Sequence, residues 1–344
     1  MRAVQHRATV AGSLPVSTAP PSDSKDSFMA QHKTLRIFGA GGFGVNIARH
    51  YQPTSPDIAD APLVAYLDTS KSNLKGDNEA FSYLIEGIDG SGKKRDLNVE
   101  SIRRHITPAL TKFPAGDFNL VLFSGSGGSG SVFGPLLVDE LLSRKKQVIV
   151  MLLGDSDSAI ATNNTLNTIK TLSALSAKHG TAVTIVYEEM AHGSQRRQVD
   201  DMFHEAIKAI RGLTSGLVDE IDTMDIGNWL AYEKVTSHQP GLSLLNIYTA
   251  NERLNDLYEA LSVASLYSSK DEPHGVVKAA YRTTGYTNNQ GTQPTHFVIT
   301  QSGLHAIAEA LKRKVDEYKD QAAHVASQHV SLHEPGTGSD FMVL

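Results

Sequence analysis

The chain has no cysteine among its 344 residues. Disulfide bonds, thiolate metal sites and cysteine nucleophiles are therefore excluded, and the composition is compatible with a reducing cytosol. The longest apolar run near the middle of the chain, residues 148–153, is far shorter than the roughly 20 residues that a membrane-spanning helix needs. The formal net charge of −5 gives no reason to expect a nucleic-acid-binding surface. We therefore expect no membrane span and no direct nucleic-acid binding by the fold.

Two further kinds of site lack their sequence signatures. The chain has no Gly-x-x-x-x-Gly-Lys-Ser/Thr motif, so a P-loop cannot hold a nucleotide triphosphate here. The 14 histidines are scattered without metal-ligand spacing, and we predict no metal site built from protein ligands. If phosphates are bound, backbone groups must hold them.

A Gly/Ser-rich segment, Ser124 to Ser131, stands between two apolar segments. Residues 117–123 before it have the character of a strand, and residues 132–142 after it have that of a helix with buried leucines. A flexible linker would join polar surfaces, whereas this segment joins two that must both be buried. Small residues before a helix expose unpaired backbone N–H groups to an anion, which indicates a phosphate-binding loop.

A second glycine-rich loop, residues 39–46, follows the first apolar segment. By itself it fits a dinucleotide-binding unit with Asp68 as the ribose contact, although Asp68 lies farther along the chain than the usual ~20 residues. An NAD-dependent oxidoreductase with a Rossmann domain is therefore one alternative. Two glycine loops converging from neighbouring strands instead favour a nucleoside triphosphate.

Short β-rich runs alternate with helical patterns from Leu35 onward, which predicts an α/β fold with a parallel sheet covered by helices on both faces. In such sheets ligands bind at the carboxyl ends of the strands. A long helix is expected from about 198 to 212. The later pattern predicts a smaller α+β domain with strands at 242–248, 276–281 and 296–300, a helix at 252–266, and a long helix from 302 to about 328.

An acidic segment follows the long central helix and contains Asp222 and Asp225. Two carboxylates three residues apart face the same way on a helical turn, where they could polarise water or hold a cation. The same residues also fit a solvated helix start with N-cap character. Spacing leaves both interpretations open.

Several motifs in one order resemble the tubulin/FtsZ superfamily, most closely the phage-encoded tubulins of the PhuZ type. They are a glycine loop with an asparagine, a later Gly/Ser-rich loop, a long central helix and an Asp-x-x-Asp segment. The resemblance covers roughly residues 34–318. The segments that carry it are Ala40–Asn46, Ser126–Pro135, Thr168–Leu172, Asp222–Trp229 and His296–Ile299.

The resemblance implies a GTPase that binds GTP or GDP with Mg²⁺ between the two glycine loops. The segment from Gly87 to Lys94 would cover the γ-phosphate, and Asp200 would read the guanine base. The Asp-x-x-Asp segment would complete catalysis on the nucleotide of the next subunit, through Asp222 and Asp225. The nucleotide-binding residues implied in this way are Gly41, Gly42, Phe43, Asn46, Asp68, Gly127, Gly128, Ser129, Gly130, Ser131 and Asp200.

The implied fold is a Rossmann-type GTPase domain, a central helix, a smaller α+β domain and a long C-terminal helix. The expected parts are a disordered extension (1–33), the GTP-binding domain (34–196), the central helix (197–218), the acidic loop with the α+β domain (219–301), the long helix (302–330) and a tail (331–344).

By the same resemblance, the protein would polymerise head-to-tail into homopolymer filaments in the cytoplasm of an infected bacterium. There the filaments would position phage DNA, its compartment or capsids. A bacterial division GTPase of the FtsZ type is the nearest alternative. The tail departs from the strongly acidic tails of phage tubulins, since its only acidic residues are Glu334 and Asp340.

Overall fold

The computed structural model describes residues 33–53, 61–88, 90–190, 193, 195–215, 218–249, 260–272, 274–275, 278–287 and 293–327. The extension expected at 1–33, apart from Lys33, and the tail expected at 331–344 lie outside these residues. No helix in the described ranges is both long enough and apolar enough to cross a membrane.

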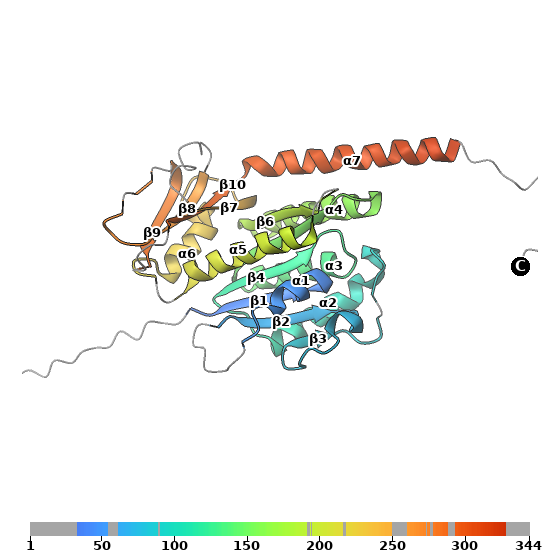
Figure 1. Ribbon diagram of the computed structural model, residues 1–344, viewed down its shortest axis with the longest axis horizontal. Helices are drawn as coiled ribbons and strands as arrows, with labels where there is room; N and C mark the ends of the chain where they lie inside the picture. Colours follow the sequence, from blue (N-terminus) through green and yellow to red (C-terminus); the bar gives the residue numbers. More distant parts are fainter. Residues whose placement is uncertain are drawn as a thin grey trace, which may run out of the picture. The chain divides into compact units, whose positions relative to one another are not determined.

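The amino-terminal half alternates strands and helices (Figure 1). Its strands are β1 (Leu35–Ala40), β2 (Leu63–Asp68), β3 (Ser82–Leu84), β4 (Phe118–Ser124), β5 (Gln147–Asp155) and β6 (Val183–Met190). Its helices are α1 (Gly41–Arg49), α2 (Val99–Lys112), α3 (Gly130–Ser143) and α4 (Ala159–His179), with 3₁₀ turns η1 (Lys71–Leu74) and η2 (Arg95–Asn98).

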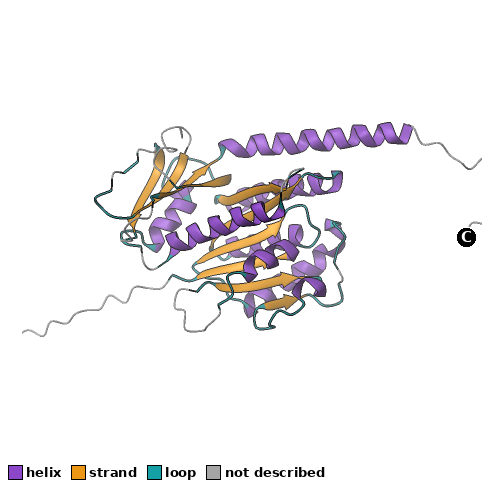
Figure 2. Cartoon of the chain, in the orientation of Figure 1, coloured by secondary structure: helices purple, strands orange, loops and turns teal. Residues whose placement is uncertain are grey.

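Helix α5 (Arg196–Thr214) leads to the second half of the chain. There α6 (Thr223–Leu230) and the 3₁₀ turn η3 (Tyr232–Lys234) precede β7 (Leu242–Tyr248), β8 (Ala260–Tyr267), β9 (Ala279–Tyr286) and β10 (Thr295–Thr300). Helix α7 (Ser302–Ser327) ends the described chain. Figure 2 shows the same elements coloured by type.

All the described strands belong to one sheet, in the order β3-β2-β1-β4-β5-β6-β7-β10-β8-β9. The pairs from β3 to β7 are parallel, which confirms the predicted parallel α/β sheet. Strand β10 is antiparallel to both β7 and β8. The strands of the predicted α+β part thus extend the first sheet through the β6–β7 pair.

One expected element is wrong. Residues 260–266, predicted as the second half of a helix, form strand β8 between β10 and β9. Every residue of β8 is buried. A short apolar run that is buried on both faces shows no alternation of apolar and polar residues. Its sequence pattern therefore does not distinguish a strand from a buried helix. The first part of that predicted helix, 252–259, lies outside the described residues.

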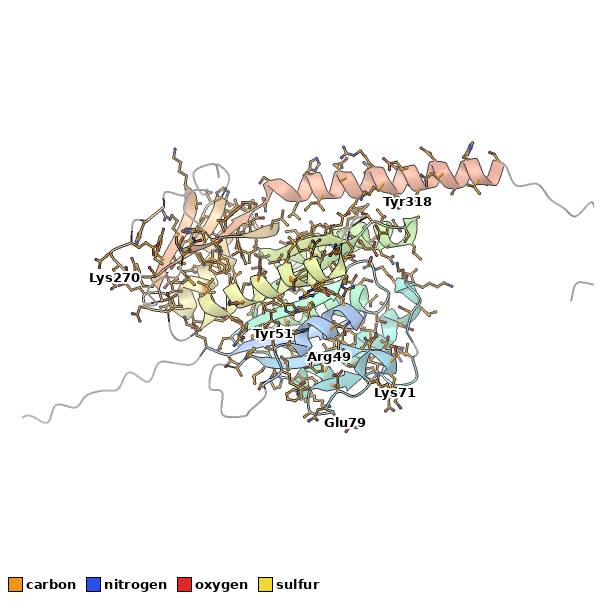
Figure 3. All side chains as sticks on the ribbon, in the orientation of Figure 1. Arg49, Tyr51, Lys71, Glu79, Lys270 and Tyr318 are labelled. Carbon is orange, nitrogen blue, oxygen red and sulfur yellow. The ribbon has the colours of Figure 1, made fainter. Side chains whose placement is uncertain are left out.

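Hydrophobic cores fill both faces of the sheet. Alternating residues of β1 illustrate this, because Ile37 packs in the core under α1 and α5 while Phe38 packs in the core under α2, α3 and α4. Helix α7 joins the second core through Leu304 and Leu311 and lies along α4 (Figure 1). Farther along α7, the Tyr318 hydroxyl donates to the Ser156 carbonyl across 3.0 Å (Figure 3).

Candidate nucleotide site

Loops from three neighbouring strands meet at the carboxyl edge of the sheet. Strands β2, β1 and β4 are adjacent and parallel, so Asp68, Gly41 and Ser124 emerge at the same edge. They enclose a cavity of about 290 Å³. The residues lining it are Ala40, Gly41, Gly42, Phe43, Asp68, Ser70, Asn73, Gly90, Ser91, Gly92, Lys93, Ser124, Gly127, Gly128, Ser129 and Gly130.

The two glycine loops are in direct contact. Gly41 has a φ of +71°, a conformation that residues with a Cβ rarely adopt, and an added Cβ would lie 2.9 Å from the Gly130 backbone. Helices α1 and α3 begin at these two positions. The first-turn amides of both helices therefore converge on one cavity, where the helix dipoles favour an anion.

Asp68 supplies a carboxylate at the base of the cavity and is only 1% exposed. Its Oδ1 accepts hydrogen bonds from the Thr69 and Ser70 amides, and its Oδ2 accepts one from Asn73 across 2.8 Å. Burial raises the pKa of Asp68, while these hydrogen bonds act in the opposite direction. Beside it, the Thr69 and Ser129 hydroxyls lie 2.6 Å apart and join the β2 loop to the Gly/Ser-rich loop.

Asp200 lies beside the cavity and is not part of its lining. Its Oδ1 accepts a hydrogen bond from Arg196 Nε across 2.8 Å, and the Arg196 guanidinium lies 5.3 Å from the centre of the Phe43 ring. Phe43 lines the cavity and packs edge-on against Phe203 of α5. The start of α5 is thereby held against the first glycine loop.

Two other residues expected to bind nucleotide also lie outside the lining. Asn46 is exposed on α1, and its Oδ1 accepts a hydrogen bond from Arg49. The Ser131 hydroxyl is buried and donates to the carbonyls of Gly127 and Gly128. Ser131 thus shapes the Gly/Ser-rich loop from beneath.

The acidic pair lies at the opposite edge of the sheet. Lys33, which precedes β1, donates to the Ile221 carbonyl across 2.8 Å, so the acidic segment sits at the amino end of β1. The glycine loops follow its carboxyl end. Six residues of strand span about 20 Å, and the two sets of residues are therefore too far apart to act on one ligand within a single chain.

Asp222 and Asp225 form a capping box at the start of α6. The Asp222 carboxylate accepts from the Asp225 amide across 2.8 Å, and the Asp225 carboxylate accepts from the Asp222 amide across 3.0 Å. Tyr281 of β9 donates to Asp225 Oδ1 across 3.3 Å. The N-cap interpretation left open by the spacing is therefore correct, and it also gives both carboxylates a defined orientation.

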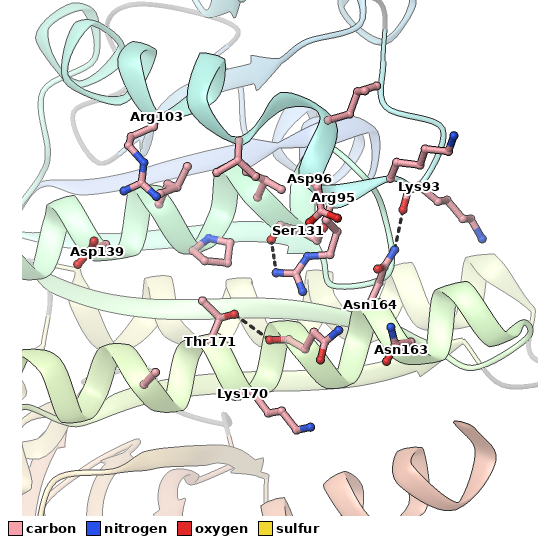
Figure 4. Close-up of a pocket in the computed structure, with 18 of the residues that line it drawn as sticks. Lys93, Arg95, Asp96, Arg103, Ser131, Asp139, Asn163, Asn164, Lys170 and Thr171 are labelled. Atoms are coloured by element: carbon pink, nitrogen blue, oxygen red, sulfur yellow. Dashed lines mark hydrogen bonds between the residues drawn. The ribbon is translucent and has the colours of Figure 1, made fainter. Parts of the chain in front are cut away.

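A larger groove of about 1230 Å³ lies between α2, α3 and α4 (Figure 4). Its rim is mostly cationic, with Lys93, Lys94, Arg95, Arg103 and Lys170 against Asp96 and Asp139. The groove shares only Lys93 with the cavity at the glycine loops. Gly41, Gly42 and residues 127–130 line the smaller cavity and not this groove, so the smaller cavity is the candidate site for phosphates.

Sequence reasoning missed three residues that organise the site: Thr69, Asn73 and Asn164. The first two belong to a polar run directly after β2, and this position at a strand end is a usable signal. Asn164 lies inside α4, far along the chain, and nothing in the local sequence marks it.

Phage tubulins are among the known proteins to which this chain is similar. A family model described as the C-terminal domain of phage tubulin-like proteins matches residues 221–304. A phage tubulin-like protein of Pseudomonas phage PhiPA3 is 29% identical over 325 residues, covering 92% of this chain and all of the relative.

Solved structures agree with this similarity. The protofilament of TubZ from bacteriophage PhiKZ superposes with a TM-score of 0.77 at 27% identity, covering 88% of this chain and 94% of that one. The phage tubulin PhuZ with GDP gives a TM-score of 0.76 at 25% identity, with the same coverage. By its fold, the order of its motifs and these similarities, the chain is most like the phage tubulin-like proteins of the tubulin/FtsZ superfamily.

Proposed function

We propose that this protein is a GTPase that polymerises head-to-tail and hydrolyses GTP at the contact between successive subunits. The observation that carries the proposal is the separation of the glycine-loop cavity from Asp222 and Asp225 by the length of β1. Because the sheet keeps the cavity and the acidic pair apart within one chain, the two can meet only between two copies that stack along the strand direction.

Guanine nucleotide is the ligand that we assign to the cavity. A related phage tubulin carries GDP in its structure, and the chain resembles it over 88% of its length. The first-turn amides of α1 and α3 would bind the phosphates, with Gly41, Gly42, Gly127, Gly128, Ser129 and Gly130 as the small residues that allow close approach. Asp200, held by Arg196, is the proposed contact for the base.

Mg²⁺ fits the same cavity as a partner of the nucleotide. Mg²⁺ keeps several waters and binds through one or two carboxylates together with phosphate oxygens. Asp68 is the only carboxylate among the described residues lining the cavity. When bound, the cation would neutralise charge that develops on the phosphates. No cluster of three acidic or histidine side chains that would hold a metal without phosphate occurs among the described residues.

Catalysis would be completed by the acidic pair of the adjoining subunit. Phosphoryl transfer needs little covalent chemistry from the protein beyond stabilising charge and placing the attacking water. Asp222 and Asp225 would place that water, since the capping box and Tyr281 fix both carboxylates at the pole that meets the next subunit. Turnover per subunit would then rise with protein concentration.

Filament formation is the proposed cellular activity. A protofilament structure is known for the similar TubZ of bacteriophage PhiKZ. We propose that this chain forms homopolymers in the cytoplasm of an infected bacterium, where they position phage DNA, its compartment or capsids.

Phosphate release from GTP, measured across protein concentrations with pelleting in parallel, tests the proposal. We expect specific activity to rise steeply above a critical concentration, together with pelleted protein. A dilute, unassembled sample that hydrolyses GTP as fast as the assembled protein would contradict catalysis between subunits. Binding of NAD without any response to GTP would favour the oxidoreductase alternative.

A further inference from the structure

The segment from Gly90 to Lys94 packs directly onto the Gly/Ser-rich loop. A Cβ added at Gly128 would overlap the Ser91 hydroxyl and lie 3.2 Å from the Lys93 amide. Both segments line the cavity at the carboxyl edge of the sheet. We call the segment Gly90–Lys94 the lid of the cavity; it lies so close to Gly128 that no side chain fits there.

The backbone of the lid is left-handed at several residues, including one with a side chain. Lys93 has a φ of +64°, and the neighbouring Gly90 and Gly92 have φ of +60° and +53°. Left-handed backbone is unfavourable for a residue with a side chain and persists where surrounding contacts hold it. The lid therefore needs an external anchor at Lys93.

One buried side chain provides that anchor. Asn164 of α4 is 6% exposed, and its Nδ2 donates to the Lys93 carbonyl across 2.9 Å (Figure 4). The same Nδ2 donates to the Ser126 carbonyl across 3.1 Å. The first acceptor belongs to the lid and the second to the Gly/Ser-rich loop. A single amide thus joins the two walls of the cavity.

Other contacts hold the two ends of the lid but none of them bridges the walls at Lys93. Asn98 donates to the Gly90 carbonyl across 3.0 Å, and Arg95 donates to the Ser131 carbonyl across 3.2 Å. The Lys93 ammonium lies 3.8 Å from Asp155, at a surface where ion pairs contribute little. Asn164 is therefore the contact on which closure at Lys93 depends.

We infer that Asn164 is a positioning residue that latches the lid over the terminal phosphate and thereby sets the preference for a nucleoside triphosphate over a diphosphate. The inference rests on the proposed nucleotide site. A lid held closed on the outer part of the cavity contacts a third phosphate, whereas a diphosphate held by the amides of α1 and α3 depends on it less.

The test compares Asn164→Asp with Asn163→Asp in the full-length protein. Asn164→Asp keeps the size of the side chain but removes both donated hydrogen bonds. Asn163 is its exposed neighbour on the same helix and is the matched control. Affinities for GTPγS and GDP are measured by competition against a fluorescent guanine nucleotide below the assembly concentration. We expect the ratio of GTPγS to GDP affinity to fall about tenfold or more in Asn164→Asp, since two buried hydrogen bonds are lost, and to stay within about twofold of wild type in Asn163→Asp.

A second measurement needs no nucleotide. Limited trypsin digestion, read by mass spectrometry, reports cleavage after Lys93 and Lys94. We expect faster cleavage there in Asn164→Asp than in wild type or Asn163→Asp, with cleavage elsewhere unchanged. If Asn164→Asp does not fold, Gly128→Ala tests the same closure from the opposite wall, because its Cβ displaces Ser91 while α4 stays intact.

The outcomes separate this inference from the proposed function. Wild-type protein that binds no guanine nucleotide contradicts the proposed function, while the digestion still tests the latch. Wild-type protein that prefers GTPγS, with Asn164→Asp retaining the same preference and the same trypsin resistance, overturns the latch alone.

Discussion

Lys33 and Ile221 join the amino end of β1 to the acidic segment. The Lys33 ammonium donates to the Ile221 carbonyl across 2.8 Å, and Ile221 directly precedes Asp222. Burial lowers the pKa of Lys33, while the nearby Asp222 and Asp225 raise it. This lysine therefore connects the rigid sheet to the pair of carboxylates that we assign to catalysis.

Lys33→Met should reduce GTP turnover by assembled protein by about three- to tenfold, because a loosely held segment places water less precisely. Filaments should still form. Phosphate release normalised to pelleted protein measures the effect, and Lys319→Met, on the exposed side of α7, is the control. Turnover equal to wild type at equal polymer mass would show that Lys33 does not position the segment.

Asp225→Asn separates the charge of Asp225 from its capping role. The amide oxygen of asparagine can still accept from the Asp222 backbone, so α6 should keep its start. We expect filaments to form but turnover to fall by about 10² or more, the scale of lost acid–base or water-placing groups, and disassembly to slow. Glu100→Gln, a charge-matched change on α2, should behave as wild type. Normal hydrolysis by Asp225→Asn would refute the catalytic role.

Asp225→Ala removes the hydrogen bond from the Asp222 amide as well as the charge, while the Asp222 side chain still caps α6. It should share the loss of turnover and also lower the free energy of unfolding by about 1 kcal/mol. Urea unfolding of both variants, followed through the single tryptophan, Trp229, measures this difference. Equal stability of the two variants would mean that the capping box contributes nothing measurable.

His296 on β10 should make stability depend on pH. It is fully buried, its Nδ1 lies 2.9 Å from the Ser265 hydroxyl, and burial lowers the pKa of His296 to about 4. Because this pKa lies below the unfolded value near 6.5, the folded state binds fewer protons. The contribution of neutral His296 to the free energy of unfolding is therefore complete above pH 6.5 and is lost as the pH falls towards 4.

The variant His296→Gln isolates this contribution. Between pH 7 and pH 4, the free energy of unfolding of wild type should fall by up to about 3 kcal/mol more than that of the variant. Urea unfolding at the two pH values measures it. Parallel losses in both proteins would assign the acid sensitivity to other groups.

Leu311 should anchor α7 to the core. It is 1% exposed in the core shared with α4, whereas Val325 on the same helix is 67% exposed. Leu311→Ala should cost about 2–5 kcal/mol of stability, and Val325→Ala less than about 0.5 kcal/mol. Thermal or urea unfolding compares them. A small effect at Leu311 would mean that α7 is held mainly by polar contacts such as that of Tyr318 with Ser156.

Local chemistry explains why much of the site could be predicted. The Gly/Ser-rich loop lies between a buried strand and a helix, and its position at a strand end follows from its neighbours in sequence. Eight of the expected nucleotide-binding residues line one cavity. The bounds of α5, β7 and α7 followed closely from apolar periodicity for the same reason, whereas the strand expected at 276–281 is β9 at Ala279–Tyr286. Strand β8 did not follow from it, because a run buried on both faces shows no period.

The roles of Asn164 and Lys33 could not be predicted from sequence patterns. Each acts through a hydrogen bond to a backbone carbonyl far away in the chain, at Lys93 and Ser126 for the first and at Ile221 for the second. A backbone acceptor leaves no side-chain signature at its position. Such pairings exist only once the sheet has brought the segments together.

The amino-acid sequence by itself determined the α/β character, the two glycine-rich loops at strand ends and the position of the acidic segment, since each depends on neighbouring residues and their periodicity. Tertiary structure alone decided that the loops form one cavity, that the acidic pair lies a strand's length away from it, and that Asn164 bridges its walls. The physical reason is that strand order and direction set these distances, and both arise from packing between residues far apart in the chain.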